Sequence, residues 1–188
     1  MLGVRRAFWV ALLLMSCNGD EEKPDPPQLQ PLAIEWASVT VNSGRLNGFT
    51  IDYPKGWRVE QITSGWGLQF IAPESGGFRP NFHVYWGTRG KTVEESVRDG
   101  ERKYLQRGPG RSTALERKKT TVAGMPARLL IHTRDGEQGP ITWMSWFFAD
   151  PRRGHGELKG VCLSSQLTLL GYRRIFEEFA RRIRFRAP

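Results

Sequence analysis

The stretch GFTIDYPKGW, residues 48–57, decides the fold. Its apolar residues alternate with polar ones up to Tyr53, which is the period of a β-strand with one face in a hydrophobic core. Pro54 has a fixed φ and no N–H, so it ends the strand, and Gly56 gives the backbone freedom to turn. The stretch therefore predicts a hairpin corner, from which the chain returns as a second strand at 57–62.

Strand signals continue along the rest of the chain. Short runs rich in β-branched and aromatic residues recur, with clusters of Gly, Ser and Pro between them. We expect strands at about 36–41, 49–53, 57–62, 68–72, 81–86, 114–122, 126–133, 141–148 and 158–163.

The strand expected at 141–148 is apolar on both faces. Trp143 and Phe147 point to one side, while Trp146 and Phe148 point to the other. A strand of this kind must be covered on both faces, so the sheet is expected to lie between two further layers.

Two helices are predicted to supply those layers. Thr92 and Glu95 have the spacing of a capping box, so the first helix should run from there to about residue 106. The second begins near Tyr172 and has an apolar stripe that includes Phe176 and Phe179. Together these elements predict an α+β fold in which helices cover a mostly antiparallel sheet.

The N-terminal residues 1–16 have the features of a secretory signal peptide. Arg5 and Arg6 precede an apolar run that is well short of the ~20 residues of a membrane-spanning helix. The following Leu14-Met15-Ser16-Cys17 resembles the lipobox of bacterial lipoproteins, which implies that Cys17 carries acyl chains and becomes the mature N-terminus. The alternative is an ordinary signal peptide or anchor with an incidental cysteine.

Residues 17–31 contain four prolines and are acidic, so they predict an extended spacer that separates a domain of residues 32–188 from the bilayer. Two or three acyl chains hold a protein durably at a membrane. We therefore expect a lipid-anchored protein of the bacterial cell envelope, and the sequence does not decide between inner and outer membrane.

Several segments together resemble the PsbP-like superfamily, which includes DcrB-type and LpqN-type bacterial lipoproteins. They are residues 49–57, the helix from Thr92, residues 121–128, and the terminal Phe176-x-x-Phe179 helix that leads to residues 183–185. The resemblance implies an αβα sandwich with a central, mostly antiparallel sheet. It implies no catalytic residue, because the superfamily has no shared catalytic motif.

No recognised catalytic motif occurs in the sequence: a G-x-S-x-G elbow, a P-loop, an H-E-x-x-H pair and a dinucleotide fingerprint are all absent. His83 and His132 are expected on strand surfaces, without a second metal ligand at suitable spacing. Cys162 lies in an apolar run and is expected to be a buried hydrophobic residue. The sequence therefore predicts no catalytic, cofactor-binding or metal-binding residue and a protein that is not an enzyme.

The charge of the chain is concentrated in the expected domain. The formal net charge is +9, of which residues 1–16 carry +2 and residues 17–31 carry −3, leaving +10 for residues 32–188. A strongly basic surface favours anionic partners. The candidate anion-binding face consists of Arg98, Arg102, Lys103, Arg107, Arg173, Arg174, Arg181 and Arg182. The alternative is a solvated, arginine-rich surface without a binding role.

The function expected from these features is a non-enzymatic, membrane-tethered binding or assembly accessory for an acidic protein or an anionic envelope component. Nucleic acid is not an expected partner, because exported lipoproteins seldom meet it. One alternative is an envelope enzyme, which predicts a deep pocket with His83 or His132 beside a carboxylate. Another is a small-ligand carrier, which predicts an apolar cavity near Trp143 or Trp146.

Overall fold

The computed structural model describes residues 33–42, 46–62, 67–87, 92–106, 112–150 and 154–185. The predicted signal peptide, Cys17, the spacer and Arg107 lie outside these residues. The chain from Ile34 onward forms one compact unit. Within the described ranges, no helix has both the length and the apolar character that crossing a membrane requires.

Seven antiparallel strands form the larger sheet, in the order β3-β4-β5-β9-β8-β7-β6. Strand β6 forms one edge of this sheet and β3 the other. The strands are β3 (Arg58–Gln61), β4 (Gly67–Ile71), β5 (Asn81–Trp86), β6 (Ser112–Val122), β7 (Met125–Arg134), β8 (Ile141–Asp150) and β9 (Gly154–Leu163).

A second sheet contains β1 (Trp36–Thr40), β2 (Phe49–Pro54) and β10 (Ile183–Phe185), in the order β1-β2-β10. The predicted hairpin at residues 48–57 is therefore wrong, because β2 pairs with β1 and β10 whereas β3 pairs with β4. Gly56, at a φ of 90°, turns the chain from one sheet into the other. The local sequence specifies the strand and the turn, but it does not specify the pairing partner.

The helices are α1 (Val93–Glu101), α2 (Ser164–Leu169) and α3 (Tyr172–Arg181). A π-helical turn, η2 (Arg102–Gln106), continues α1. The predicted capping box is confirmed, because the Thr92 amide donates to Glu95 at 2.8 Å and the Glu95 amide donates to the Thr92 hydroxyl at 3.2 Å. Helix α2 and strand β10 were not predicted as separate elements.

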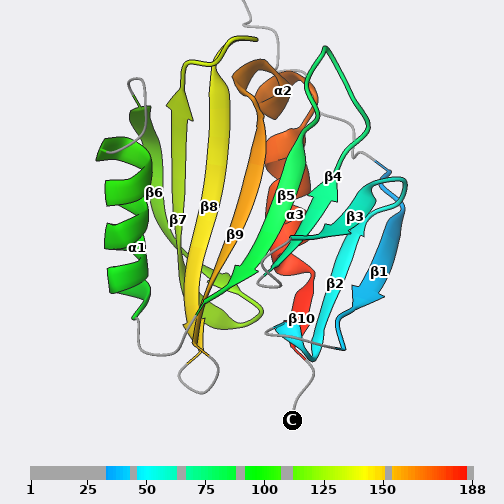
Figure 1. The fold of residues 1–188 in the computed structure, drawn as a ribbon, viewed down its shortest axis with the longest axis vertical. Helices are drawn as coiled ribbons and strands as arrows, with labels where there is room; N and C mark the ends of the chain where they lie inside the picture. The colour runs from blue at the N-terminus through cyan, green and yellow to red at the C-terminus, as the bar shows by residue number, and fades with distance from the viewer. Residues whose placement is uncertain are drawn as a thin grey trace, which may run out of the picture. The chain divides into compact units, whose positions relative to one another are not determined.

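Helices α1 and α3 cover opposite faces of the larger sheet (Figure 1). A Cβ atom at Gly100 of α1 would lie 2.3 Å from the Phe147 ring, and one at Gly160 of β9 would lie 2.5 Å from the Phe176 ring of α3. Both layers thus pack closely on the sheet through glycine. The expectation that residues 141–148 are covered on both faces is confirmed, since Phe147 lies under α1 while Trp146 belongs to the core on the α3 side.

The hydrophobic core lies between the larger sheet, α3 and the smaller sheet. Phe82 of β5 stacks on Phe179 of α3 with ring centroids 4.1 Å apart, and Phe49 of β2 meets Trp86 edge-on. Cys162 is fully buried in this core, and burial raises the pKa of its thiol to about 12. Its predicted role as a buried hydrophobic residue is therefore confirmed.

Candidate functional site

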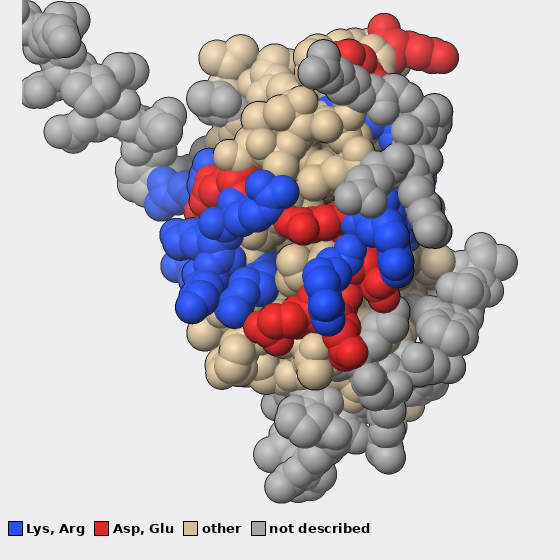
Figure 2. Space-filling view, turned by 90° about the vertical axis from the view of Figure 1, so that its left-hand side faces the viewer, with Lys and Arg blue, Asp and Glu red and all other residues tan. Residues whose placement is uncertain are grey.

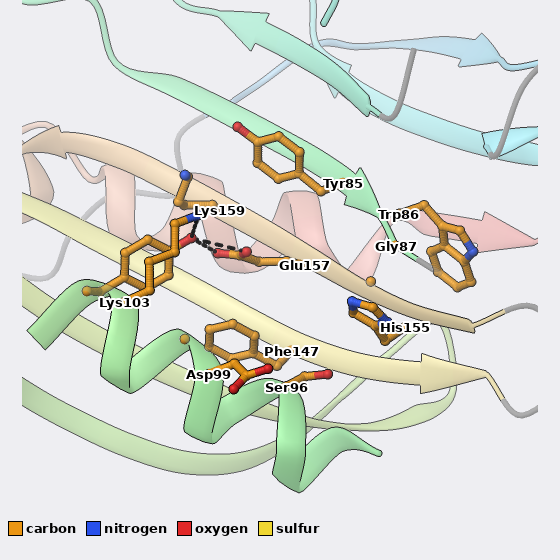
Figure 3. Close-up of a pocket in the computed structure, with 13 residues that line it drawn as sticks. Tyr85, Trp86, Gly87, Ser96, Asp99, Lys103, Phe147, His155, Glu157 and Lys159 are labelled. Carbon is orange, nitrogen blue, oxygen red and sulfur yellow. Dashed lines mark hydrogen bonds between the residues drawn. The ribbon is translucent and has the colours of Figure 1, made fainter. Parts of the chain in front are cut away.

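A cavity of about 330 Å³ opens on the α1 side of the larger sheet, between α1, η2 and strands β5, β8 and β9 (Figure 3). Its floor includes the Phe147 ring. The polar side chains that line it are Tyr85, Ser96, Asp99, Lys103, Tyr104, His155, Glu157 and Lys159.

The cavity exists because α1 covers only part of this face. Helix α1 packs on β7 and β8, whereas β5 and β9 lie beside it. Strand β9 alternates strictly: Gly156 and Gly160 face the core, where aromatic rings approach them closely, and Glu157 and Lys159 face the cavity. The alternation therefore places two charged side chains next to the uncovered part of the sheet.

Glu157 is held by hydroxyl donors. The Tyr104 hydroxyl from η2 donates to both carboxylate oxygens, at 2.9 and 3.2 Å, and the Ser145 hydroxyl donates at 3.2 Å. Burial first, and then the charge of Glu157, raises the pKa of Tyr104 well above its ordinary value. This arrangement keeps Tyr104 protonated and ties η2 to β9.

Lys159 lies among aromatic rings and makes no ion pair with a described carboxylate. Its Nζ atom is 5.1 Å from the centre of the Tyr85 ring and 5.5 Å from that of Tyr104, within the range of cation–π attraction. Burial lowers the pKa of Lys159, and the nearby charge of Lys103 lowers it further, while Glu157 opposes both effects.

Lys103 is the second ammonium group of the site. It lies over the Tyr104 ring at 5.0 Å, and its nearest recorded partner is the Tyr104 hydroxyl at 3.5 Å. Asp99, by contrast, pairs with Arg102. The carboxylates of the cavity thus have hydrogen-bond donors, whereas its two lysines lie against aromatic rings and form no ion pair with a described carboxylate.

His83 lies beside the cavity, on the same face of β5 as Tyr85. The Tyr85 hydroxyl donates to its Nδ1 at 2.9 Å, and its Nε2–H donates to the Asn81 side-chain oxygen at 2.6 Å. This direction follows because the Asn81 amide nitrogen donates to the Arg79 carbonyl, which leaves only the oxygen facing His83. Burial, and then Lys159, lowers the pKa of His83 to about 4, so the ring is neutral at pH 7.

His132 is buried, so its expected place on a strand surface is wrong. Its ring is only 2% exposed and stacks between Tyr104 and Trp143, with centroid distances of 5.3 and 5.2 Å. The physical reason is η2, which lays Tyr104 over strand β7. Burial, followed by the charges of Lys159 and Arg134, lowers the pKa of His132 to about 4.

Neither His83 nor His132 lines the cavity; each contacts a tyrosine that does, and His155 lines the cavity itself. Among the residues that the structure describes, no group of three or more metal-ligating side chains comes together.

The residues of the candidate anion-binding face do not form one surface. Arg98, Arg102 and Lys103 lie on α1 and η2. Across the sheet, Arg173, Arg174 and Arg181 lie on α3, and Arg182 caps its C-terminal end. Arg107 is outside the described residues. The two groups are far apart because α1 and α3 cover opposite faces of the larger sheet.

Several of these cations already form ion pairs with carboxylates. Arg173 pairs with Glu116 at 2.7 Å, and Arg181 and Arg182 both pair with Glu178. Figure 2, which looks onto the side of α1 and β6, shows lysine and arginine side chains interleaved with carboxylates. Exposed pairs of this kind contribute little free energy, but they reduce the positive potential of the surface. Lys103 is the residue of the candidate set that the structure places in the cavity.

The sequence reasoning missed Tyr85, Tyr104, Glu157 and Lys159 as site residues. The expected strand begins at residue 158, which leaves Glu157 outside it, and Tyr104 falls within the helix expected to run to about residue 106. One signal was present: in residues 154–160, glycine alternates with His155, Glu157 and Lys159 except at one position. This pattern indicates a strand with one closely packed face and one polar face.

The sequence matches no protein-family model and no curated protein. Solved structures do match the fold. The cyanobacterial PsbP protein CyanoP from Synechocystis is 12% identical, with 86% of this chain and 99% of that chain covered and a TM-score of 0.59. The Ran-binding protein Mog1p from Saccharomyces cerevisiae is 9% identical, with 81% and 96% covered and a TM-score of 0.57.

LpqN of Mycobacterium tuberculosis is 16% identical, with 82% of this chain and 92% of that chain covered and a TM-score of 0.52. These likenesses confirm the α+β fold expected from the sequence: the chain has a PsbP-like fold. At these sequence identities, the likenesses support the fold but not the role of any residue.

Proposed function

We propose that the protein is a non-enzymatic binding protein of the bacterial cell envelope, tethered through lipid on Cys17. Its PsbP-like domain binds an acidic protein or an anionic envelope component. The order of signal peptide, lipobox and spacer supports the location. LpqN, which shares the fold, is described as involved in cell envelope biogenesis, and this agrees with the same location.

One observation carries the binding role: of the candidate cations without a carboxylate partner in the described part of the chain, Arg98 and Lys103 lie on the α1 side, whereas Arg174 lies on α3. Arg98 and Lys103 are exposed there, and neither forms an ion pair with a carboxylate in the described part of the chain. On α3, Arg173, Arg181 and Arg182 are paired with glutamates. The α1 side is therefore where an anionic partner gains most from Coulomb attraction.

The tether is tested by Cys17→Ser. Without the thiol no acyl chain can be attached, so the protein should move from the membrane fraction to the soluble fraction after cell breakage. Immunoblots of the two fractions measure this change. If the variant stays in the membrane fraction, the proposed lipid anchor is wrong.

The binding surface is tested by Arg98→Glu, with Arg174→Glu as the matched control on α3. Arg174 is also exposed and has no ion pair with a described carboxylate. Sedimentation with vesicles containing anionic phospholipid and with a polyglutamate resin should show weaker binding for Arg98→Glu only. Binding should also fall steeply between 0.05 and 0.5 M salt, on the order of the screening expected for surface charges. Equal losses in both variants, or binding indifferent to salt, would contradict the proposal.

A small-ligand carrier is the second candidate, because the structure contains a cavity of suitable size. The carrier hypothesis predicted an apolar cavity near Trp143 or Trp146, but neither residue lines this cavity: Trp146 is packed in the core, and Trp143 stacks on His132. A carrier would bind its ligand on the α1 side, so the two candidates concern neighbouring parts of one surface.

A further inference from the structure

We infer that the cavity beside α1 binds a small organic anion, with its carboxylate or phosphate between Lys103 and Lys159 and its body along the Phe147 ring. This deepens the proposed binding role and rests on it in one respect, that the α1 side attracts anions. It adds a ligand class and a defined place for the ligand's charge.

The sign of the ligand follows from which groups in the cavity already have partners. Glu157 accepts hydrogen bonds from Tyr104 and Ser145, and Asp99 pairs with Arg102. Lys159 has aromatic faces around its ammonium group and no recorded hydrogen-bond acceptor among the described residues. A ligand entering the cavity therefore meets two ammonium groups, those of Lys103 and Lys159, that have no carboxylate partner among the described residues. A carboxylate or phosphate satisfies both ammonium groups and reduces the repulsion between them.

The opposite end of the cavity carries a second unsatisfied group. The Ser96 hydroxyl is buried and has no hydrogen-bond partner in the described structure, although Ser96 lines the cavity. Buried hydroxyls normally have a partner, because leaving one unpaired is costly. In Figure 3, Ser96 and His155 lie at the end away from Lys159. A polar group on the ligand would supply the missing hydrogen-bond partner of Ser96 at this end of the cavity.

The distance between the two ends sets the ligand's length. Ser96 and Lys103 are two helical turns apart, which corresponds to about 10 Å along the helix axis. Lys159 follows His155 by four positions in the strand, which corresponds to about 13 Å. Between them the Phe147 ring, on which Gly100 of the helix packs closely, provides an apolar wall. A volume of about 330 Å³ suits a molecule built on a single ring.

The test uses the lipidated protein purified in an uncharged detergent and titrated calorimetrically with three probes. Two are anions, 4-hydroxycinnamate and phenyl phosphate; the third is methyl 4-hydroxycinnamate, which has the same ring and hydroxyl but no charge. We expect saturable binding of both anions and at least roughly tenfold weaker binding of the ester.

Variants then locate the contacts. Lys159→Met should weaken both anions at least about tenfold, and Lys103→Met should weaken them less, because its ammonium group is more exposed. Lys118→Met is the matched control, since Lys118 is an exposed lysine on β6 outside the cavity. Ser96→Ala should weaken 4-hydroxycinnamate but not the shorter phenyl phosphate, which does not reach that end.

Three results would overturn the inference: no saturable binding of either anion, an ester that binds as tightly as the acid, or unchanged affinity in Lys159→Met. Because a substitution inside the cavity can disturb folding, NOEs between probe and Phe147 ring protons in the unmodified protein give an independent location. NOEs to other sites alone would also overturn it. The Arg98→Glu variant separates this inference from the proposed function. Its loss of vesicle binding tests the proposed function, and its retained binding of the probes tests the cavity.

Discussion

His132 is a residue that the folded protein keeps uncharged. It lies between the Tyr104 and Trp143 rings, and its Nδ1 atom is buried with no hydrogen-bond partner in the described structure. Such a site disfavours a second proton, which explains why the pKa is lowered to about 4 from an ordinary value of 6.5. His83 has a similarly lowered pKa but a complete set of hydrogen bonds.

These two histidines predict a loss of stability in mild acid. Above pH 6.5 the two histidines are neutral in both the folded and the unfolded protein. Below pH 6.5 they bind protons in the unfolded chain but not in the folded chain, so the free energy of unfolding falls between pH 6.5 and about 4. For His132 the loss should reach roughly 2–3 kcal/mol. Urea denaturation across this range measures it, and His132→Phe should show a clearly shallower decline. An equally steep decline in the variant would contradict this account.

Helix α1 is positioned on the sheet by Gly100, although glycine has a low helix propensity. Glycine destabilises a helix interior by about 1 kcal/mol relative to alanine. At Gly100 it is nevertheless required, because any Cβ would lie 2.3 Å from the Phe147 ring, which is itself 3% exposed. Close approach at this point also places η2, and hence Tyr104, over the sheet.

Gly100→Ala should therefore destabilise the protein, although helix propensity alone predicts the opposite sign. We expect a loss of about 1–3 kcal/mol in the free energy of unfolding, from overpacking against the Phe147 ring. In a Phe147→Leu background the same change should cost less. Chemical denaturation of the four proteins gives the coupling energy. A more stable Gly100→Ala variant would show that the helix is less tightly packed than described.

Element by element, the sequence predicts strands well where the two faces differ. The residues of β5 alternate between a core face and an α1 face, and this periodicity was sufficient to place the strand, whereas β8 was placed by its run of large apolar residues. Helix α2 was missed because long-range contacts stabilise it: Gln166 accepts from the Leu163 amide and donates to the Ser75 carbonyl. The Tyr104–Glu157 contact joins residues 53 positions apart, so no local pattern indicates it.

At the scale of the whole molecule, strand β2 joins the two ends of the folded unit. Strand β1 pairs along one side of it and β10 along the other, with Ile183 opposite Ile51. Ile183 is 1% exposed, and Ile51 is fully buried. The unit is therefore complete only when its last strand is in place.

Truncation tests this closure. Removal of residues 183–188 should lower the free energy of unfolding by at least roughly 3 kcal/mol, because it removes β10 and leaves a cavity where Ile183 was packed. Removal of residues 186–188 alone, which retains β10, is the matched control and should change stability little. Circular dichroism melting curves compare the two. Similar curves would mean that β10 contributes little to the fold.

Strand β6, at the edge of the larger sheet, carries Arg117, Lys118 and Lys119 in succession. An unpaired strand edge is a template on which another polypeptide can add its own strand and so begin aggregation. Two copies that met through β6 would bring six positive side chains together. Charge repulsion between these side chains thus opposes edge-to-edge pairing of two copies through β6.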